Sequence, residues 1–313
     1  MNKKVLGIVA AAAVVVVGGV YLLKGDGNKS TYSEGNIQVT HELGTTVLDA
    51  APEKVVVLDL GALDVLSELG ANIVGVPKSG KLPDYLSEFE SEEYVNVGSV
   101  KEPDLEAINE LNPDLIVMAG RMADYYDEFT EIAPTLYVSV DGATYLEDFT
   151  SLVENYGKIF DNEEKSTEII ETVTNKVNEA TNAVKDLNET ALITLVNGRN
   201  VSVYGAASRF GLIHQLGFNQ IDENIDDSTH GQEVTFEYLI EKNPAYIFVV
   251  DRNSVTGSEE ITAESVIENE LTKNTDAYKN GNIVYLNSTN WYTVSGGYTS
   301  TLEMVNEVLN SVK

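Results

Sequence analysis

The sequence predicts an α/β protein made of two similar lobes with mostly parallel sheets, which one long helix connects. Three observations support this: a strand–helix–strand pattern near the start of the chain, one segment that occurs once in each half, and a long polar helical region between the halves. At 313 residues the chain is long enough for two domains, each with its own core.

The N-terminal segment, residues 1–24, predicts an uncleaved membrane anchor. Its apolar run from Val5 to Leu23 would span roughly 28 Å as a helix, and no acceptable cleavage site follows it. Lys3 and Lys4 should stay cytoplasmic, which places the rest of the chain outside the cell. Cleavage within the small-residue run, giving a secreted or periplasmic protein, is the alternative. Residues 25–35 predict a polar linker.

The first predicted lobe covers residues 36–145. Residues 36–48 alternate like a hairpin at a sheet edge, and residues 54–58 are a continuous apolar run typical of a buried strand. A helix with its leucines on one face should end at Gly70, and further strands are expected at residues 73–76, 115–118 and 135–140. Pro103 suits the first position of a helix.

The connector and the second lobe follow at residues 146–188 and 189–313. The connector reads as one long helical region with a break near Asp161 and Asn162, which implies a stiff joint. The second lobe is expected to contain a first strand near residue 191, a helix over residues 210–216, an apolar strand before Arg252, a strand at NIVYL, and a closing helix over residues 298–312.

The repeated segment is the most informative pattern in the chain. Glu106 aligns with Glu237, an Asn-Pro pair follows each glutamate by six residues, and Arg121 and Arg252 follow by fifteen. Each copy predicts a short helix that starts with an acid, a break, an apolar strand, and an arginine at the end of the strand. Such a repeat predicts two lobes that each aim an arginine at the same place.

Composition excludes several classes of function. The net charge of −30, from 20 Lys+Arg against 50 Asp+Glu, argues against nucleic acid and against a polybasic membrane surface. There is no cysteine, hence no disulfide, thiolate metal site or cysteine nucleophile. The chain lacks a P-loop, a G-x-S-x-G elbow and H-E-x-x-H, so we do not expect an enzyme. Three scattered histidines do not suit a bare-metal binder.

From Asn36 to Lys313 the chain resembles the substrate-binding proteins of ABC importers for iron–siderophore complexes and cobalamin. The resemblance rests on PEKVVVLDLGALDVLSELG, the repeated LEAINELNPDLIV and FEYLIEKNPAYIFVV, YGAASRFGLIHQLGF, HGQEVTFEYL and WYTVSGG. It implies two Rossmann-like lobes with a ligand cleft between them, no cofactor, and a monomer that passes its ligand to an ABC permease. SRFG, HGQ and the strand-end arginine resemble the branch for ferric catecholates, petrobactin-like ligands included. Cobalamin or haem remains the alternative ligand.

The resemblance also implies roles for particular residues. Arg121, Arg209 and Arg252 would bind the anionic ferric complex, which suits guanidinium because it stays charged and forks onto oxygens; ordinary surface salt bridges are the alternative. Arg199, in a turn, is expected to have no such role. The lipid-attachment cysteine usual in Gram-positive members is missing, which leaves the mode of anchoring open.

His230 and Tyr292 are candidate Fe(III) ligands or siderophore contacts, because a hard cation accepts phenolate and imidazole where a tetradentate siderophore leaves sites open. A structural histidine and an ordinary tyrosine are the alternatives. Tyr125 and Trp291 are candidate cleft aromatics, with core packing as the alternative; the same choice applies to Tyr126, Tyr204 and Phe210. His41 and His214 look structural.

Glu106 and Glu237 are candidate docking residues for the permease, since the resemblance places one glutamate per lobe against permease arginines. A helix dipole alone would also favour an acid in each first turn.

Overall fold

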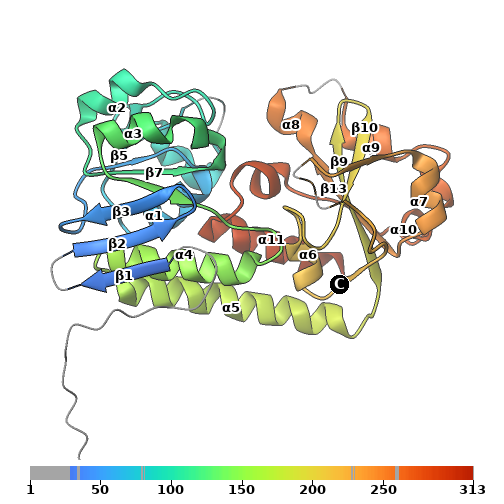
Figure 1. Ribbon diagram of the computed structural model, residues 1–313. Coiled ribbons are helices and arrows are strands. Elements are labelled where there is room, and N and C mark those ends of the chain that lie inside the picture. Colours follow the sequence, from blue (N-terminus) through green and yellow to red (C-terminus); the bar gives the residue numbers. More distant parts are fainter. Residues whose placement is uncertain are drawn as a thin grey trace, which may run out of the picture.

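The computed structural model describes residues 29–33, 36–78, 80, 82–226, 228, 230–257 and 261–312. Two α/β lobes lie side by side, and the long helix α5 runs beneath both (Figure 1). The predicted anchor at residues 1–24 lies outside the described residues. Within them, no helix has the length and apolar character needed to cross a membrane.

The first lobe contains a five-stranded parallel sheet. Its strands are ordered β6 (Val95–Asn96), β5 (Ile73–Val76), β4 (Val55–Val57), β7 (Leu115–Ala119) and β8 (Thr135–Val138). The strands predicted at residues 54–58, 73–76, 115–118 and 135–140 are confirmed, with small shifts at their ends. β4 and β8 are buried along their whole length, as expected when both faces of a parallel sheet are covered.

The helices of this lobe are α1 (Leu60–Glu68), α2 (Leu105–Leu111) and α3 (Tyr126–Ile132), with 3₁₀ turns η1 (Asp84–Glu90) and η2 (Gly120–Tyr125). The expected helix end at Gly70 is confirmed by its positive φ of 77°. The prediction for Pro103 is wrong. Asp104 caps α2 instead, because its carboxylate can accept the N–H of Ala107, at 3.0 Å, and proline offers no such acceptor.

A small antiparallel sheet lies beside the first lobe. It contains β1 (Lys29–Ser33), β2 (Asn36–His41) and β3 (Gly44–Leu48). The predicted hairpin is confirmed, but the predicted linker at residues 25–35 is wrong over Lys29–Ser33. Backbone pairing with β2, from Lys29 opposite Thr40 to Ser33 opposite Asn36, turns this polar stretch into an edge strand.

The connector is two helices, α4 (Tyr145–Ile159) and α5 (Glu163–Lys185). The predicted break is confirmed: Asp161, with a φ of 53°, lies between them. Helix α5 buries Ile169 and Val173 in the core of the first lobe, and Ala180 and Val184 in that of the second. One rigid element therefore belongs to both lobes, as the expected stiff joint requires.

The second lobe has a mixed sheet, less parallel than expected. Its order is β12 (Gln232–Val234), β10 (Asn200–Tyr204), β9 (Thr190–Asn197), β13 (Tyr246–Asp251) and β14 (Ile283–Tyr285), with β11 (Asn219–Gln220) also on β9. β10 pairs antiparallel with β9 and β12, whereas the other pairs are parallel. The antiparallel part arises because β9 and β10 are joined by a tight turn at Gly198, whose φ is 61°.

The remaining elements of this lobe are mostly short. They are α6 (Leu212–Gln215), α7 (Phe236–Lys242), α8 (Arg252–Thr256), α9 (Ala263–Ile267), η3 (Thr272–Asn274), α10 (Asp276–Lys279), the π-helical turn η4 (Thr289–Thr293) and α11 (Tyr298–Ser311). The helix predicted over residues 210–216 is only one turn long, and the closing helix is confirmed.

The repeat is confirmed at the level of the backbone. Asn112 ends α2 and Asn243 ends α7, and both adopt the left-handed conformation with a φ of 46°. Asparagine tolerates this conformation better than most residues, which explains why an Asn-Pro pair marks both helix ends. Strands β7 and β13 then begin three residues later in each copy.

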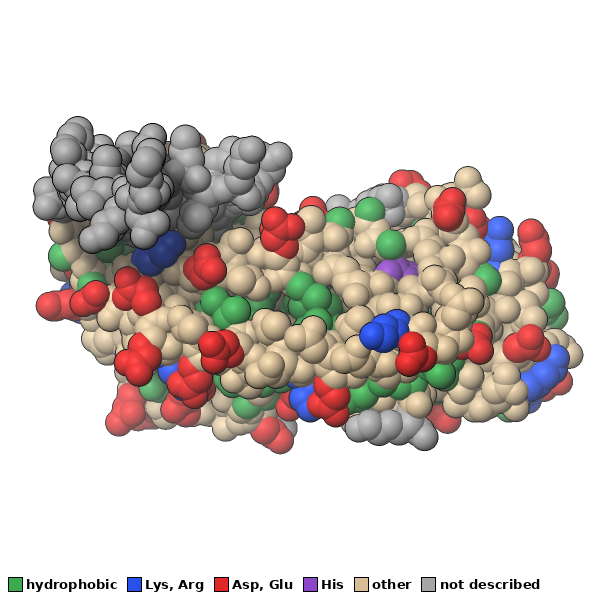
Figure 2. Space-filling model, turned by 90° about the horizontal axis from the view of Figure 1, so that it is seen from below, with side chains coloured by type: hydrophobic (Ala, Val, Ile, Leu, Met, Phe, Trp, Pro, Cys, Tyr) green, Lys and Arg blue, Asp and Glu red, His purple; other side chains and the backbone are tan. Residues whose placement is uncertain are grey.

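Among the charged side chains on the surface that the helical underside presents, most are acidic (Figure 2). Basic side chains are fewer and scattered there, which matches the net charge of −30. Arginines that gather in one place therefore stand out against the rest of the molecule.

Candidate functional site

Three arginines converge on Tyr292, in the turn η4. Arg121 donates from Nη2 to the carbonyl oxygen of Tyr292 at 2.7 Å, and Arg209 donates to the same oxygen at 3.2 Å. Arg252 donates from Nε to the Tyr292 hydroxyl at 3.0 Å. The segment that carries this turn lies between the two lobes (Figure 1). We call these four residues the arginine cluster.

The fold explains why these arginines meet. Arg121 follows β7 of the first lobe, and Arg252 is the first residue after β13 of the second. Ligands of open α/β sheets bind outside the carboxyl ends of the strands, and both arginines lie at such ends. The bonds from Arg121 to the carbonyl oxygens of Tyr292, at 2.7 Å, and Thr293, at 3.4 Å, reach from one lobe to the other.

Arg209 comes from the SRFG turn before α6, and this turn packs against the start of the connector. A Cβ atom on Gly142 would collide with the backbone of Ser208 and Arg209, and one on Gly211 would collide with the carbonyl oxygens of Ala206 and Gly142. Two glycines therefore allow the two backbones to touch. This close approach fixes the backbone position from which the Arg209 side chain reaches the cluster.

The cluster carries a concentrated positive charge. Burial lowers the pKa of Arg209, and the charge of Arg121 adds to this effect. The Arg209 guanidinium lies 4.3 Å from the centre of the Tyr292 ring, within the range of a cation–π contact. None of the three arginines forms an ion pair with an acid among the described residues. Within the described residues, these arginines therefore do not form the ordinary surface salt bridges of the alternative interpretation.

Tyr292 responds to this charge. Burial raises the pKa of its hydroxyl, but the hydrogen bond from Arg252 and the charges of Arg209, Arg252 and Arg121 together outweigh burial. The net pKa is lower than that of an ordinary tyrosine. A phenol that ionises more readily offers its phenolate oxygen to a hard cation such as Fe(III) at a lower pH.

Two residues near the cluster were missed by the sequence analysis. Asn197, the last residue of β9, accepts from Arg252 Nη1 at 2.6 Å, and Asp59, the N-cap of α1, interacts electrostatically with Arg121. Burial raises the pKa of Asp59 more than Arg121 lowers it. Asn197 directly follows Val196, which pairs with Asp251, so Asn197 lies at the end of the strand next to β13. A polar residue at the end of a neighbouring strand was therefore the signal that the sequence offered.

His230 is exposed, at the end of a turn next to Gly231. Gly231 has a φ of 70°, and a Cβ atom there would collide with the ring of Tyr204. The pKa of Tyr204 is raised by burial first, and Arg209, Tyr292 and Arg252 all act on it electrostatically. Through Gly231, the chain beside His230 therefore touches Tyr204, which in turn interacts with three members of the arginine cluster. Among the described residues, no group of three or more His, Asp or Glu could hold a metal ion.

The candidate aromatic residues separate into different places. Trp291 is only 1% exposed and lies in the core of the second lobe, so the prediction that it lines the ligand site does not fit this structure. Tyr125 is half-buried beside Phe129, with ring centres 6.2 Å apart. Tyr126 packs edge-on against His41 of the small sheet. Phe210 is fully buried under Tyr204.

The remaining histidines are structural, as expected. His41 is buried and bonds through Nε2 to Thr46 at 3.0 Å, and His214 bonds through Nδ1 to the carbonyl of Phe218 at 3.0 Å. Burial lowers the pKa of both histidines. Both are therefore held in the neutral form more than a free histidine is.

Glu106 and Glu237 occupy equivalent positions, each the second residue of its helix, and both are exposed. Figure 1 shows α2 and α7 on the outer surface of their lobes. A hydrogen bond from Thr235 and one from its own backbone N–H lower the pKa of Glu237. The position of Glu237 at the start of its helix therefore accounts for its lowered pKa. The observation that bears on a docking role is that both glutamates are exposed.

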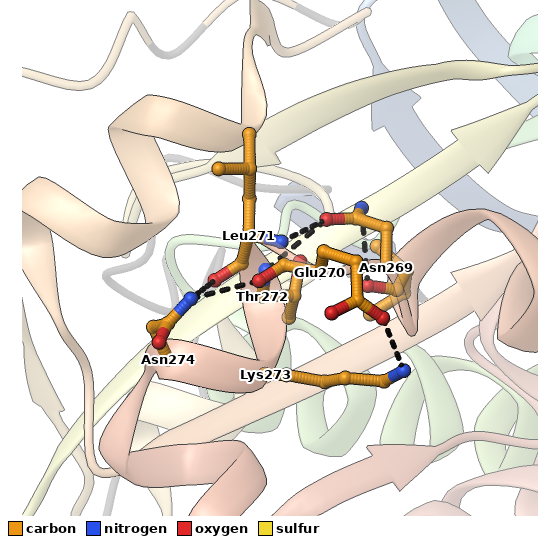
Figure 3. Close-up of polar contacts among 7 residues, drawn as sticks. Asn269, Glu270, Leu271, Thr272, Lys273 and Asn274 are labelled. Atoms are coloured by element: carbon orange, nitrogen blue, oxygen red, sulfur yellow. Dashed lines mark hydrogen bonds and ion pairs between the residues drawn. The ribbon is translucent and has the colours of Figure 1, made fainter.

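Arg199 lies apart from the cluster. It lines an open groove of about 520 Å³ with Phe236, Val266, Leu271 and the polar residues Ser265, Asn269 and Glu270. The turn that forms one wall is internally bonded: Asn269 Oδ1 accepts the N–H of Leu271 at 2.9 Å, and Glu270 pairs with Lys273 at 2.7 Å (Figure 3). The groove shares no residue with the arginine cluster.

Comparisons with known proteins agree with this fold. The petrobactin-binding protein YclQ of Bacillus subtilis is 40% identical over 324 residues, covering 100% of each chain. Its crystal structure matches with a TM-score of 0.85 and 41% identity over 89% of this chain and 99% of that one.

The periplasmic catecholate-siderophore binding protein VctP of Vibrio cholerae matches with a TM-score of 0.83 and 35% identity, over 87% and 99% of the two chains. BauB, in complex with two molecules of acinetobactin and ferric iron, matches with a TM-score of 0.82 and 30% identity, over 89% and 99%. Residues 55–289 match the family described as Periplasmic binding protein. The chain therefore belongs to the periplasmic binding protein family.

Proposed function

We propose that this protein captures an anionic ferric siderophore, of the catecholate or petrobactin-like class, between its two lobes and delivers it to an ABC permease for iron uptake. The observation that carries the proposal is the arginine cluster. Each guanidinium has five N–H donors, and the bonds to described residues use one or two of them. The donors that bond to no described residue could meet the oxygens of a multiply charged anion.

The relatives support the choice of ligand. The names of the similar proteins specify petrobactin, catecholate siderophores and a ferric acinetobactin complex. A ferric tris-catecholate carries up to about three negative charges, which three guanidinium groups complement. His230 and Tyr292 would supply nitrogen and phenolate donors to iron, so the second lobe would contact the metal while both lobes contact the charge.

The protein would carry out no chemistry and need no cofactor, since its family is one of binding proteins. We expect it to act as a monomer on the extracellular side of the membrane, tethered by residues 1–24. Two relatives are named as lipoproteins; this chain has no cysteine for lipidation, so a helical anchor would take that role.

Glu106 and Glu237 would dock on arginines of the permease. They are exposed and related by the repeat, which suits a partner with two similar halves. The matched control is Glu110 and Glu241, which lie four residues further along the same helices and are also exposed. Changing Glu106 and Glu237 to alanine should abolish uptake of iron and leave siderophore affinity unchanged; changing the control pair should do neither. Equal uptake by both double variants would contradict docking through these glutamates.

The binding proposal is tested with the full-length chain in detergent. Quenching of tryptophan and tyrosine fluorescence is followed during titration with a ferric catecholate, a neutral ferric hydroxamate, cobalamin and haem. We expect tight binding of the ferric catecholate alone. Tight binding confined to the neutral hydroxamate would contradict the role of the arginines, and tight binding of cobalamin or haem would favour the alternative ligand.

A further inference from the structure

Glu307 of helix α11 makes two hydrogen bonds to the segment that carries the turn η4 and Tyr292. Glu307 accepts the backbone N–H of Asn287 at 2.8 Å through Oε1, and the indole N–H of Trp291 at 2.7 Å through Oε2. Both carboxylate oxygens are thereby used. One bond holds the chain just before the turn, and the other holds its centre.

Trp291 and Tyr292 are neighbours in this turn and face different surroundings. Trp291 lies in the core of the second lobe, with 1% of its surface exposed, whereas Tyr292 meets the three arginines. The direction of one side chain therefore sets that of the other. π-helical turns of this kind are rare and often occur at functional sites.

A second acid of α11 holds the turn by a single bond. Glu303, one helical turn before Glu307 and exposed, accepts from Asn290 Nδ2 at 2.5 Å. Burial raises the pKa of Glu307, bonds from Trp291 and Asn287 lower it, and the charge of Glu303 raises it again. Two acids at this spacing repel each other, so the hydrogen bonds to the turn must offset the repulsion.

We propose that Glu307 is a positioning residue, which holds the Tyr292 side chain at the angle needed to reach the iron of the bound siderophore. The inference rests on the proposed function. Without the Glu307 acceptor, the buried indole N–H and the Asn287 N–H lose their partner and the turn relaxes. The Tyr292 hydroxyl then moves relative to the metal. Arg209, whose backbone lies on another element, keeps its charge at the site, although its bond to the Tyr292 carbonyl changes.

The test compares two ferric complexes in the full-length protein. A tetradentate bis-catecholate leaves two iron sites open for protein ligands, and a hexadentate tris-catecholate leaves none. The variants are Glu307→Gln and, from the other side of the same bond, Trp291→Phe, which keeps a buried aromatic ring but removes the indole N–H. Glu303→Gln is the control. Thermal unfolding without ligand checks that each variant is folded.

We expect Glu307→Gln to weaken the phenolate-to-iron charge-transfer absorption of the bis-catecholate complex and to lower its affinity by about tenfold, the size of one lost charge-assisted hydrogen bond. The tris-catecholate complex should lose much less affinity. In a Tyr292→Phe background, Glu307→Gln should have no further effect, because the two residues act as one unit.

The outcomes separate the two proposals. If the wild-type protein binds neither ferric complex, the proposed function itself fails. If it binds both but the absorption of the bis-catecholate complex is the same in wild type and Tyr292→Phe, or if Glu307→Gln lowers both affinities equally or matches Glu303→Gln, the inference about Glu307 is overturned and the proposed function stands. If Glu307→Gln does not fold, Trp291→Phe decides by the same two criteria.

Discussion

Replacing Arg252 with alanine is the sharpest single perturbation of the arginine cluster. The side chain makes two bonds, from Nε to the Tyr292 hydroxyl at 3.0 Å and from Nη1 to Asn197 at 2.6 Å. It follows β13, where the repeat predicts a charge aimed at the ligand. Its loss removes one of three cations from a site proposed to hold an anion with up to about three charges.

The size of the effect follows from the geometry. Losing one partner of a buried charged pair costs about 2–5 kcal/mol, and Arg252 is only partly buried, so the lower end applies. A loss of about 2 kcal/mol raises the Kd of the ferric catecholate about 30-fold. Arg199→Ala, outside the cluster, should change it by about twofold or less.

The assay is fluorescence quenching by the ferric catecholate, with both variants measured at the same ionic strength. Without ligand, Arg252→Ala loses two hydrogen bonds of about 1 kcal/mol each, so its melting temperature should fall by only a few degrees. Equal losses of affinity for Arg252→Ala and Arg199→Ala would refute the reasoning. Full affinity in Arg252→Lys would show that charge matters and the forked geometry does not.

Three further predictions concern single residues of the site and the joint. The tyrosinate absorbance that Tyr292→Phe removes should titrate at a lower pH than that of an ordinary tyrosine, because the folded-state pKa of Tyr292 is lowered. The ionised Tyr292 therefore stabilises the fold increasingly as pH rises through that pKa, and this contribution is lost as pH falls. Burial raises the pKa of Asp64, which accepts from the Ser300 N–H, to about 6. The stability that protonated Asp64 contributes is therefore present below the pKa of an unfolded aspartate and is lost as pH rises through the folded pKa. The free energy of unfolding of Asp64→Asn should accordingly gain up to about 3 kcal/mol over wild type between about pH 4 and about pH 6, as measured by chemical denaturation. Gly142→Ala should weaken siderophore binding in titrations, because its Cβ would displace the backbone of Ser208 and Arg209.

Periodicity and the internal repeat were enough to predict most of the fold. Continuous apolar runs marked β4, β5 and β7 because a parallel sheet buries both faces of its strands. The repeat located Asn112 and Asn243, whose left-handed conformation is a local property of the residue. Strand β1 was missed because its sequence, KSTYS, has no hydrophobic alternation, and backbone pairing with β2 needs none.

The site was predictable where a residue sits at the end of a strand. Arg121 and Arg252 carry that signal in the sequence, whereas Arg209, in the SRFG turn, was proposed only from the family resemblance. Asn197 and Glu307 could not be predicted, because their roles depend on which strand and helix lie next to β13 and the turn η4. Trp291 was misassigned because adjacent residues in a turn can point into the core and into the site alternately.

A structure of the complex with a ferric catecholate, with iron located by its anomalous scattering, tests the central claim most directly. The account predicts iron between the lobes, near the Tyr292 hydroxyl, with catecholate oxygens accepting from Arg121, Arg209 and Arg252. The bonds from Arg121 and Arg209 to the Tyr292 carbonyl should then be shared with the ligand or replaced by it. Iron in the groove beside Arg199, or anywhere that leaves the three arginines as they are now, would contradict the account.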